Sequence, residues 1–190
     1  MRIDMAQMAK TNVLAGALNG RAGLTRLLEL VPSESTRPES VFLDFLNIDV
    51  ATASYLRECI VAFRDVIRGR DSLYYPIVAN SNQEVRDELL ELTRTRGDVF
   101  MTCALASDGT VSQPALVGDL EAKQLLTFTL VQRHSGTDAG ELMREYGKDE
   151  NVRHTTAWNN RLSALAKLGL IVEMRQGRLK RYRPLFQGDS

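Results

Sequence analysis

Short apolar runs alternate with amphipathic stretches along the first two thirds of the chain. The runs have the length of strands, and apolar residues at three- and four-residue spacing are typical of helices. Strands are expected at residues 2–8, 41–45, 73–79, 99–105 and 110–116, and helices at 20–31, 51–68 and 82–96. Strands that alternate with helices predict an α/β fold, a small sheet with helices packed against it.

Turn and cap residues refine this pattern. Asn80, Ser81 or Asn82 is expected to cap the helix at 82–96, and the sequence 107–109 (Ser-Asp-Gly) predicts a hairpin turn. Pro76 lacks a backbone N–H, so it indicates an irregularity or a sheet edge in the strand at 73–79.

The pattern changes after Asp119 to three helices followed by a hairpin. Helices are expected at 120–132, 139–146 and 155–168, and two strand-like runs around Gln176-Gly177 predict the hairpin. Thr137 or Asp138 is expected to cap the second helix, and Gly147 to end it in a left-handed conformation. The chain should therefore divide into two domains, 1–117 and 118–190.

The third of these helices has one apolar side. Trp158, Leu162 and Leu165 recur at one-turn spacing, so they should form a buried stripe. Trp158 is expected to be part of the core and not a platform on which bases stack. Amides, hydroxyls and a lysine occupy the remaining surface, and such groups can contact base edges and phosphates.

Charge is distributed unevenly along the chain. The 190 residues have no net charge, but residues 151–190 contain eight basic and two acidic side chains, a net charge of +6. The other 150 residues carry −6. A basic region joined to an acidic body indicates a nucleic-acid partner.

The candidate DNA-binding residues lie on the third helix, just before it, and on the hairpin. They are Arg153, Thr155, Thr156, Asn159, Asn160, Ser163, Lys167, Arg175, Arg178, Lys180 and Arg181. Phosphate neutralisation by the hairpin would supply much of the affinity for a duplex. The alternative is that the basic hairpin is only a solvated surface.

Other chemistry has little support in the sequence. Two cysteines within apolar stretches and two distant histidines predict buried free thiols and no metal site. No paired carboxylates, Ser-His-Asp order or phosphate-binding glycine loop indicates an enzyme or a cofactor. No apolar run approaches the length of a membrane span, and the first residues do not resemble a secretory signal, so a cytoplasmic protein without a membrane partner is expected.

Residues 155–171, Thr-Thr-Ala-Trp-Asn-Asn-Arg-Leu-Ser-Ala-Leu-Ala-Lys-Leu-Gly-Leu-Ile, with the arginine-rich hairpin after them, resemble the winged helix-turn-helix of bacterial MarR- and ArsR-type repressors. The resemblance covers about 65 residues and implies that the third helix enters the major groove while the hairpin is the wing. The metal-binding cysteines of ArsR-type proteins are absent, so metal sensing is not implied.

Residues 41–48, Val-Phe-Leu-Asp-Phe-Leu-Asn-Ile, and the helix opening at Asp49 are similar to a STAS-like domain, as is Asn19-Gly20-Arg21 before another helix. In that family a Ser or Thr at the helix start is phosphorylated, which makes Thr52 and Ser54 the candidates here. The Asp-Ser-Ser-Gly motif of that family does not occur here, because Asp49 is followed by Val50 and Ala51. From the residues alone, Asp49, Thr52 or Ser54 is expected to cap the helix.

These observations together predict a bacterial transcriptional regulator that binds double-stranded DNA as a homodimer. The STAS-like domain would mediate dimerisation, partner binding or signal sensing. The alternative is an adaptor in which the STAS-like domain binds a regulatory protein and the winged helix is a docking module. Salt dependence separates the two, because DNA binding weakens steeply as salt rises.

Overall fold

The computed structural model describes residues 1–32, 34–70, 72–134, 136–177 and 179–186. The chain forms two compact units, Met1–Asp119 and Leu120–Ser190, where the sequence had suggested a boundary after residue 117. The N-terminal unit is a mixed α/β fold, as predicted. No helix in the described ranges combines the length and the apolar content that crossing a bilayer requires.

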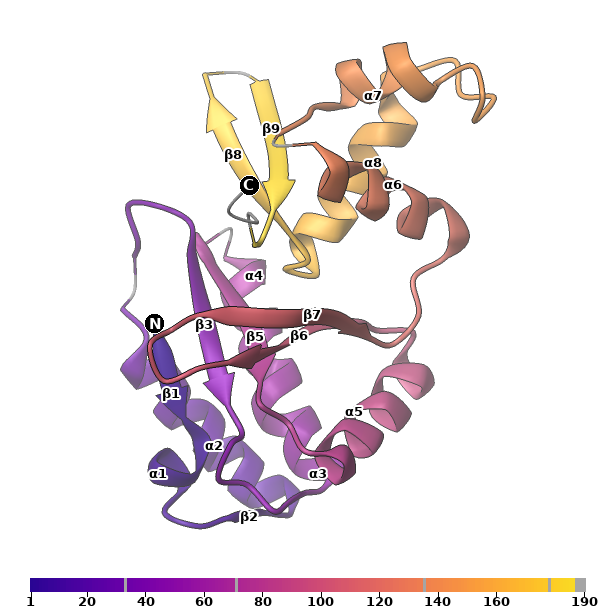
Figure 1. Cartoon of the computed structure of the whole chain (residues 1–190). Helices are drawn as coiled ribbons and strands as arrows, with labels where there is room; N and C mark the ends of the chain where they lie inside the picture. Colours follow the sequence, from indigo (N-terminus) through magenta and orange to yellow (C-terminus); the bar gives the residue numbers. More distant parts are fainter. Residues whose placement is uncertain (33, 71, 135, 178, 187–190) are drawn as a thin grey trace. The chain divides into compact units, whose positions relative to one another are not determined.

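A five-stranded sheet forms the centre of the N-terminal unit, in the order β1-β3-β5-β6-β7 (Figure 1). The first four strands run parallel, and β7 is antiparallel to β6. The strands are β1 Arg2–Asp4, β3 Glu39–Asp44, β5 Tyr74–Ala79, β6 Phe100–Leu105 and β7 Val111–Val117. Two short parallel strands, β2 (Val13–Leu14) and β4 (Val50–Ala51), pair separately.

The helices of this unit are α1 Met5–Ala9, α2 Ala17–Leu30, α3 Ala53–Leu56, η1 Arg57–Val61, α4 Ala62–Gly69 and α5 Gln83–Arg96. Because α3, η1 and α4 follow one another without a break, they confirm the helix expected at 51–68. Its middle turn, η1, is a π-helix, a rare form that often occurs at functional sites. The side chain of Asn82 caps α5 by accepting a hydrogen bond from the Val85 N–H, so one of the three expected caps is confirmed.

One hydrophobic core joins these helices to the sheet. Alternate strand residues such as Val41 and Leu43 point to the same face, and Ile60, Phe63 and Leu89 from the helices belong to the same buried cluster. Figure 1 shows α2, the α3–α4 helix and α5 on one side of the sheet. The carboxyl ends of the parallel strands and the loops after them thus lie along one edge.

One local expectation was wrong in the N-terminal unit, and another was right in one of its two alternatives. The strand expected at 2–8 ends at Asp4, because its side chain caps α1 by accepting from the Gln7 N–H. Pro76 is not at a sheet edge, since β5 lies between β3 and β6, but it does mark the irregularity that was the other expectation. The pairing of β5 with β6 begins only at Val78, so the missing N–H of Pro76 leaves no ladder bond unmade.

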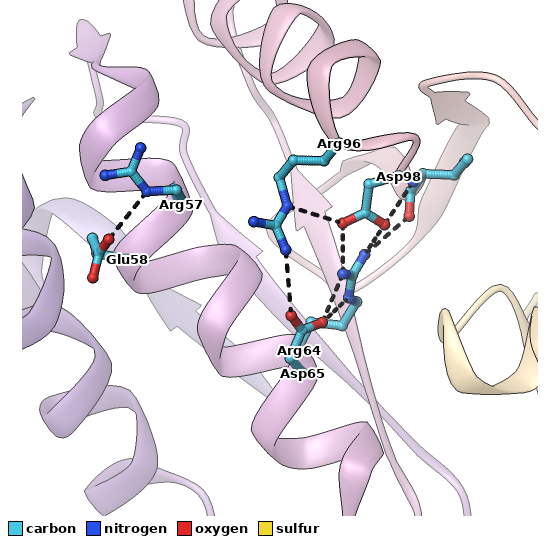
Figure 2. Close-up of polar contacts among 7 residues, drawn as sticks. Arg57, Glu58, Arg64, Asp65, Arg96 and Asp98 are labelled. Atoms are coloured by element: carbon cyan, nitrogen blue, oxygen red, sulfur yellow. Dashed lines mark hydrogen bonds and ion pairs between the residues drawn. The ribbon is translucent and has the colours of Figure 1, made fainter.

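A buried ion pair fixes α4 to the start of β6 (Figure 2). Arg64 is 4% exposed and donates two hydrogen bonds of 2.7 Å to the carboxylate of Asp98, which is 7% exposed. Its guanidinium also lies 4.4 Å from the centre of the Phe100 ring. Burial alone would lower the pKa of Arg64, but the carboxylates of Asp98 and Asp65 outweigh burial and raise it, so Arg64 keeps its positive charge.

The C-terminal unit contains three helices followed by an antiparallel hairpin, in the predicted order. They are α6 Ala122–Arg133, α7 Ala139–Tyr146, α8 Thr155–Lys167, β8 Ile171–Gln176 and β9 Leu179–Pro184. Asp138 caps α7 and forms a capping box with Glu141. Gly169, with φ of 76°, follows α8 and lets the Leu170 N–H bond back to the Leu165 carbonyl.

One expectation for these helices needs correction. Gly147 is right-handed, with φ of −59°, because the Glu150 N–H still bonds the Tyr146 carbonyl and the chain stays helical past the glycine. The left-handed turn comes at Asn151, with φ of 49°. On α6, Leu125 is 48% exposed, and the buried residues are Thr127, Leu130 and Val131.

Candidate nucleic-acid interface

One side of α8 belongs to the core of the C-terminal unit. Trp158, Leu162 and Leu165 are each 0% exposed, which confirms the buried stripe expected from their spacing. Arg161 covers the tryptophan with its guanidinium 4.8 Å from the ring centre, and it bonds Glu150 at 3.5 Å. Arg161 therefore supports the core, and its charge is already partnered.

The other side of α8 is open to solvent and polar. Its exposed residues are Thr155, Thr156, Asn159, Asn160 and Lys167. At about 100° per residue, these positions cover an arc of about 140° on the helix surface. The side-chain amides of Asn159 and Asn160 make no hydrogen bond with any described residue, so their donors and acceptors are free for a ligand.

Ser163 lies within the same arc of the helix surface but is half-buried. Its Oγ is 3.4 Å from the Oη of Tyr182, a residue of β9 that is 0% exposed. Burial is the main reason that the pKa of Tyr182 is raised. Ser163, expected to contact DNA, thus also joins α8 to the hairpin.

The hairpin is attached to the segment before α7. The Thr137 N–H donates to the Tyr182 carbonyl at 2.8 Å, and the Tyr182 N–H donates to the Thr137 carbonyl at 2.7 Å. Arg181 bonds the Glu141 carboxylate at 3.2 and 3.3 Å and the Gly136 carbonyl at 3.2 Å. Arg181, expected to contact phosphate, is therefore engaged with its own unit.

Glu173 partly neutralises the basic face of the hairpin. Its carboxylate lies 2.9 Å from the Lys180 Nζ and 3.5 Å from the Arg175 Nε. The register pairs Arg175 with Lys180 and Glu173 with Tyr182, so these side chains share one face. The hydrogen bond to Glu173 raises the pKa of Lys180. Both cations remain at the surface, but with less net charge than a count of basic residues indicates.

Two cations close to α8 are not paired in this way. Arg153 lies just before the helix and Lys167 is its last residue, and both are exposed. Neither forms an ion pair with any residue in the described ranges. Arg178, the remaining candidate, lies outside the described residues.

The link between α7 and α8 is longer than in a compact helix-turn-helix. It spans residues 147–154, whereas the turn of that motif has about three or four residues. The Val152 N–H bonds the Gly147 carbonyl at 2.8 Å, so the link is itself folded.

In the N-terminal unit, the side chain of Thr52 caps α3. Thr52 is one of the three residues that were expected to cap this helix. Its Oγ1 accepts hydrogen bonds from the N–H groups of Tyr55 and Gly16, and it lies 3.1 Å from the Ser54 Oγ. The next N–H of the helix, that of Ala53, donates to the Glu88 carboxylate at 2.9 Å. A phosphate on Thr52 would meet this negative charge, which opposes the stabilisation that a helix N-terminus offers to phosphate.

Metal and thiol chemistry have no site in what the structure describes. Within the described ranges, no three His, Cys, Asp or Glu side chains are placed to hold a metal ion. Cys59 and Cys103 are buried free thiols, as predicted, and burial raises the pKa of each to about 11. Both thiols are therefore protonated at neutral pH and weakly nucleophilic.

No protein-family model matches this chain, and no curated protein matches its sequence.

Proposed function

We propose that the chain is a sequence-specific double-stranded DNA-binding protein, a bacterial transcriptional regulator that acts as a homodimer. In this proposal the C-terminal unit is a winged helix-turn-helix, with α8 as the recognition helix and β8–β9 as the wing. The N-terminal unit is a STAS-like domain that mediates dimerisation, partner binding or signal sensing.

The observation that carries the proposal is the division of α8 into two sides. The fully buried stripe holds the helix rigidly, and the opposite side presents Asn159 and Asn160 with unpaired amides. The major groove admits an α-helix, and asparagine can bond the N6 and N7 of adenine together. Arg153 and Lys167, one near each end of the helix, are available for phosphates on either side of the groove.

Selection from a library of random duplexes, followed by a salt titration on the selected site, tests the proposal. Four cations, Arg153, Lys167, Arg175 and Lys180, are near the surface that would face DNA. At a slope of −0.9 for each phosphate contact, log K should fall with log salt at a slope of about −3 to −4. Failure to bind any duplex at about 50 mM salt would refute DNA binding.

The adaptor function remains the second candidate because of Glu173, which lowers the positive charge of the hairpin by pairing with Lys180 and Arg175. A protein-docking surface needs less positive charge than a DNA-binding one. If the selection enriches no sequence and the titration is flat, the adaptor function is favoured.

A further inference from the structure

The N-terminal unit contains a cavity of about 220 Å³ between α2, the segment before it and the start of the long helix. Leu14 and Ala22 contribute apolar walls, and Asn19, Arg26 and Tyr55 contribute polar groups. Every residue that lines the cavity lies within the N-terminal unit. An apolar cavity of about 150 Å³ is known to admit benzene, so this one has room for a small organic molecule.

The hydroxyl of Tyr55 is the unusual group in this cavity. Tyr55 is 2% exposed, and its Oη has no nitrogen or oxygen partner among the described residues; the Cys59 thiol beside it is only a weak acceptor. A buried hydroxyl normally finds a nitrogen or oxygen partner, because leaving it unpaired costs free energy. Burial, with a smaller effect of the neighbouring Cys59, raises the pKa of Tyr55 far above its ordinary value, so the hydroxyl keeps its proton and can donate it.

Gly23 of α2 leaves room for this hydroxyl. A Cβ at Gly23 would lie 2.6 Å from the Tyr55 Oη and 2.9 Å from the Cys59 Sγ. The absence of a side chain at this position therefore allows the tyrosine to reach the cavity. The π-helical turn η1 begins two residues after Tyr55, where the helix departs from regular spacing.

The charge around the cavity is positive. Arg26 is exposed at its border, and one guanidinium nitrogen donates to the Met8 carbonyl at 3.2 Å. The positive charge of Arg26 also acts on the Tyr55 hydroxyl. No lining residue carries a carboxylate, and Arg26 forms no ion pair with a described residue. The polar end of the cavity thus offers donors and one cation, and it requires an acceptor.

We propose that this cavity binds a small organic carboxylate. The carboxylate accepts hydrogen bonds from the Tyr55 hydroxyl and from Arg26, and the apolar part of the molecule packs against Leu14 and Ala22. Such a ligand would supply the oxygen partner that the buried hydroxyl lacks, and a bidentate pair with arginine is the arrangement that carboxylates favour.

Benzoate and its neutral analogue benzamide are suitable probes, used with the full chain in isothermal titration calorimetry. Benzoate should bind with a Kd on the order of 1 mM, and benzamide about tenfold more weakly. Tyr55→Phe should weaken benzoate binding about tenfold, the effect of losing one hydrogen bond to a charged group. Arg26→Gln should remove the preference for benzoate over benzamide.

Arg21→Gln is the matched control, since Arg21 is an exposed cation on the same helix that does not line the cavity. It should leave benzoate binding unchanged. Arg26 is exposed, so its variant should fold even if a change at Tyr55 does not. No benzoate binding at about 10 mM, or full binding by both variants, would overturn the proposal. Because the titration contains no DNA, these outcomes are separate from those of the DNA-binding proposal.

Discussion

Trp158, Asn159 and Asn160 are consecutive residues that lie on different sides of α8. The tryptophan is fully buried, and the two asparagines are exposed with free amides. Stability and recognition should therefore respond to different substitutions within three residues of chain. This separation allows the reading of bases to be tested without disturbing the fold.

Asn159→Ala or Asn160→Ala should lower affinity for the selected duplex by about 1–3 kcal/mol, the value of a good bidentate contact to a base. Non-specific binding and the melting temperature should stay nearly constant, because neither amide bonds a described residue. Competition between selected and random duplexes measures the effect. Full sequence preference in both variants would mean that another face reads the bases.

Trp158→Ala should have the opposite effect. Truncation of a fully buried tryptophan costs about 3–5 kcal/mol of unfolding free energy. The Arg161 guanidinium would also lose the ring that it covers. Chemical denaturation followed by circular dichroism measures the loss, and an unchanged midpoint would contradict the assignment of Trp158 to the core.

Arg64 provides a test of the N-terminal unit. Arg64→Met leaves the buried Asp98 with only the longer 3.9 Å ion pair to Arg96 and should destabilise this unit by about 3–5 kcal/mol. Arg57→Met is the control, because Arg57 is 48% exposed and pairs with Glu58 at the surface (Figure 2). The control should leave the urea midpoint nearly unchanged. Equal midpoints for the two variants would show that the buried pair is not structurally important.

Among the secondary-structure elements, the hairpin β8–β9 depends most on one acidic residue. Glu173→Gln would release Lys180 and Arg175 from their ion pairs. The variant should bind all duplexes more tightly, because the hairpin loses a negative charge, while the salt slope should stay at about −3 to −4, since both cations are already counted in it. Glu121→Gln, at an exposed acid outside the hairpin, should have little effect. Weaker binding by the Glu173 variant would show that Glu173 positions the hairpin and does not restrain its charge.

Most elements follow from the spacing of apolar residues, because a buried side has the same period as the helix or strand that carries it. Trp158 on α8 was predicted in this way and confirmed, and the hairpin turn predicted from Ser-Asp-Gly at 107–109 was confirmed as well. Boundaries set by single hydrogen bonds were predicted less well. Asp4 ends β1 by capping α1, and Gly147 remains helical through the bond from Glu150 to Tyr146.

The composition of the candidate interface was readable from the sequence, but its ion pairing was not. The alternation of side chains along β8 places Glu173 and Arg175 on one face, and this could have been deduced. The bonds of Arg181 to Glu141 depend on how the hairpin packs against α7. The sequence does not reveal this packing, because the two residues are 40 positions apart. Counting basic residues therefore overestimates the charge that is free to meet phosphates.

At the scale of the whole molecule, the two compact units should be separable. A fragment of residues 120–190 should fold, because its core of Trp158, Leu162 and Leu165 lies within the C-terminal unit. It should bind the selected duplex more weakly than the full chain, since linked half-site readers gain effective concentration. Circular dichroism and duplex binding measure both properties. Equal affinity would argue that the N-terminal unit does not hold a dimer together.

The paired backbone bonds between Thr137 and Tyr182 have a consequence for local opening. Each residue donates its amide proton to the carbonyl of the other, so one separation exposes both protons to solvent. Their hydrogen–deuterium exchange should be protected to the same degree, although the two residues are 45 positions apart in the sequence. The hairpin can then leave its place only when the segment before α7 is released as well, so these two regions form one cooperative unit.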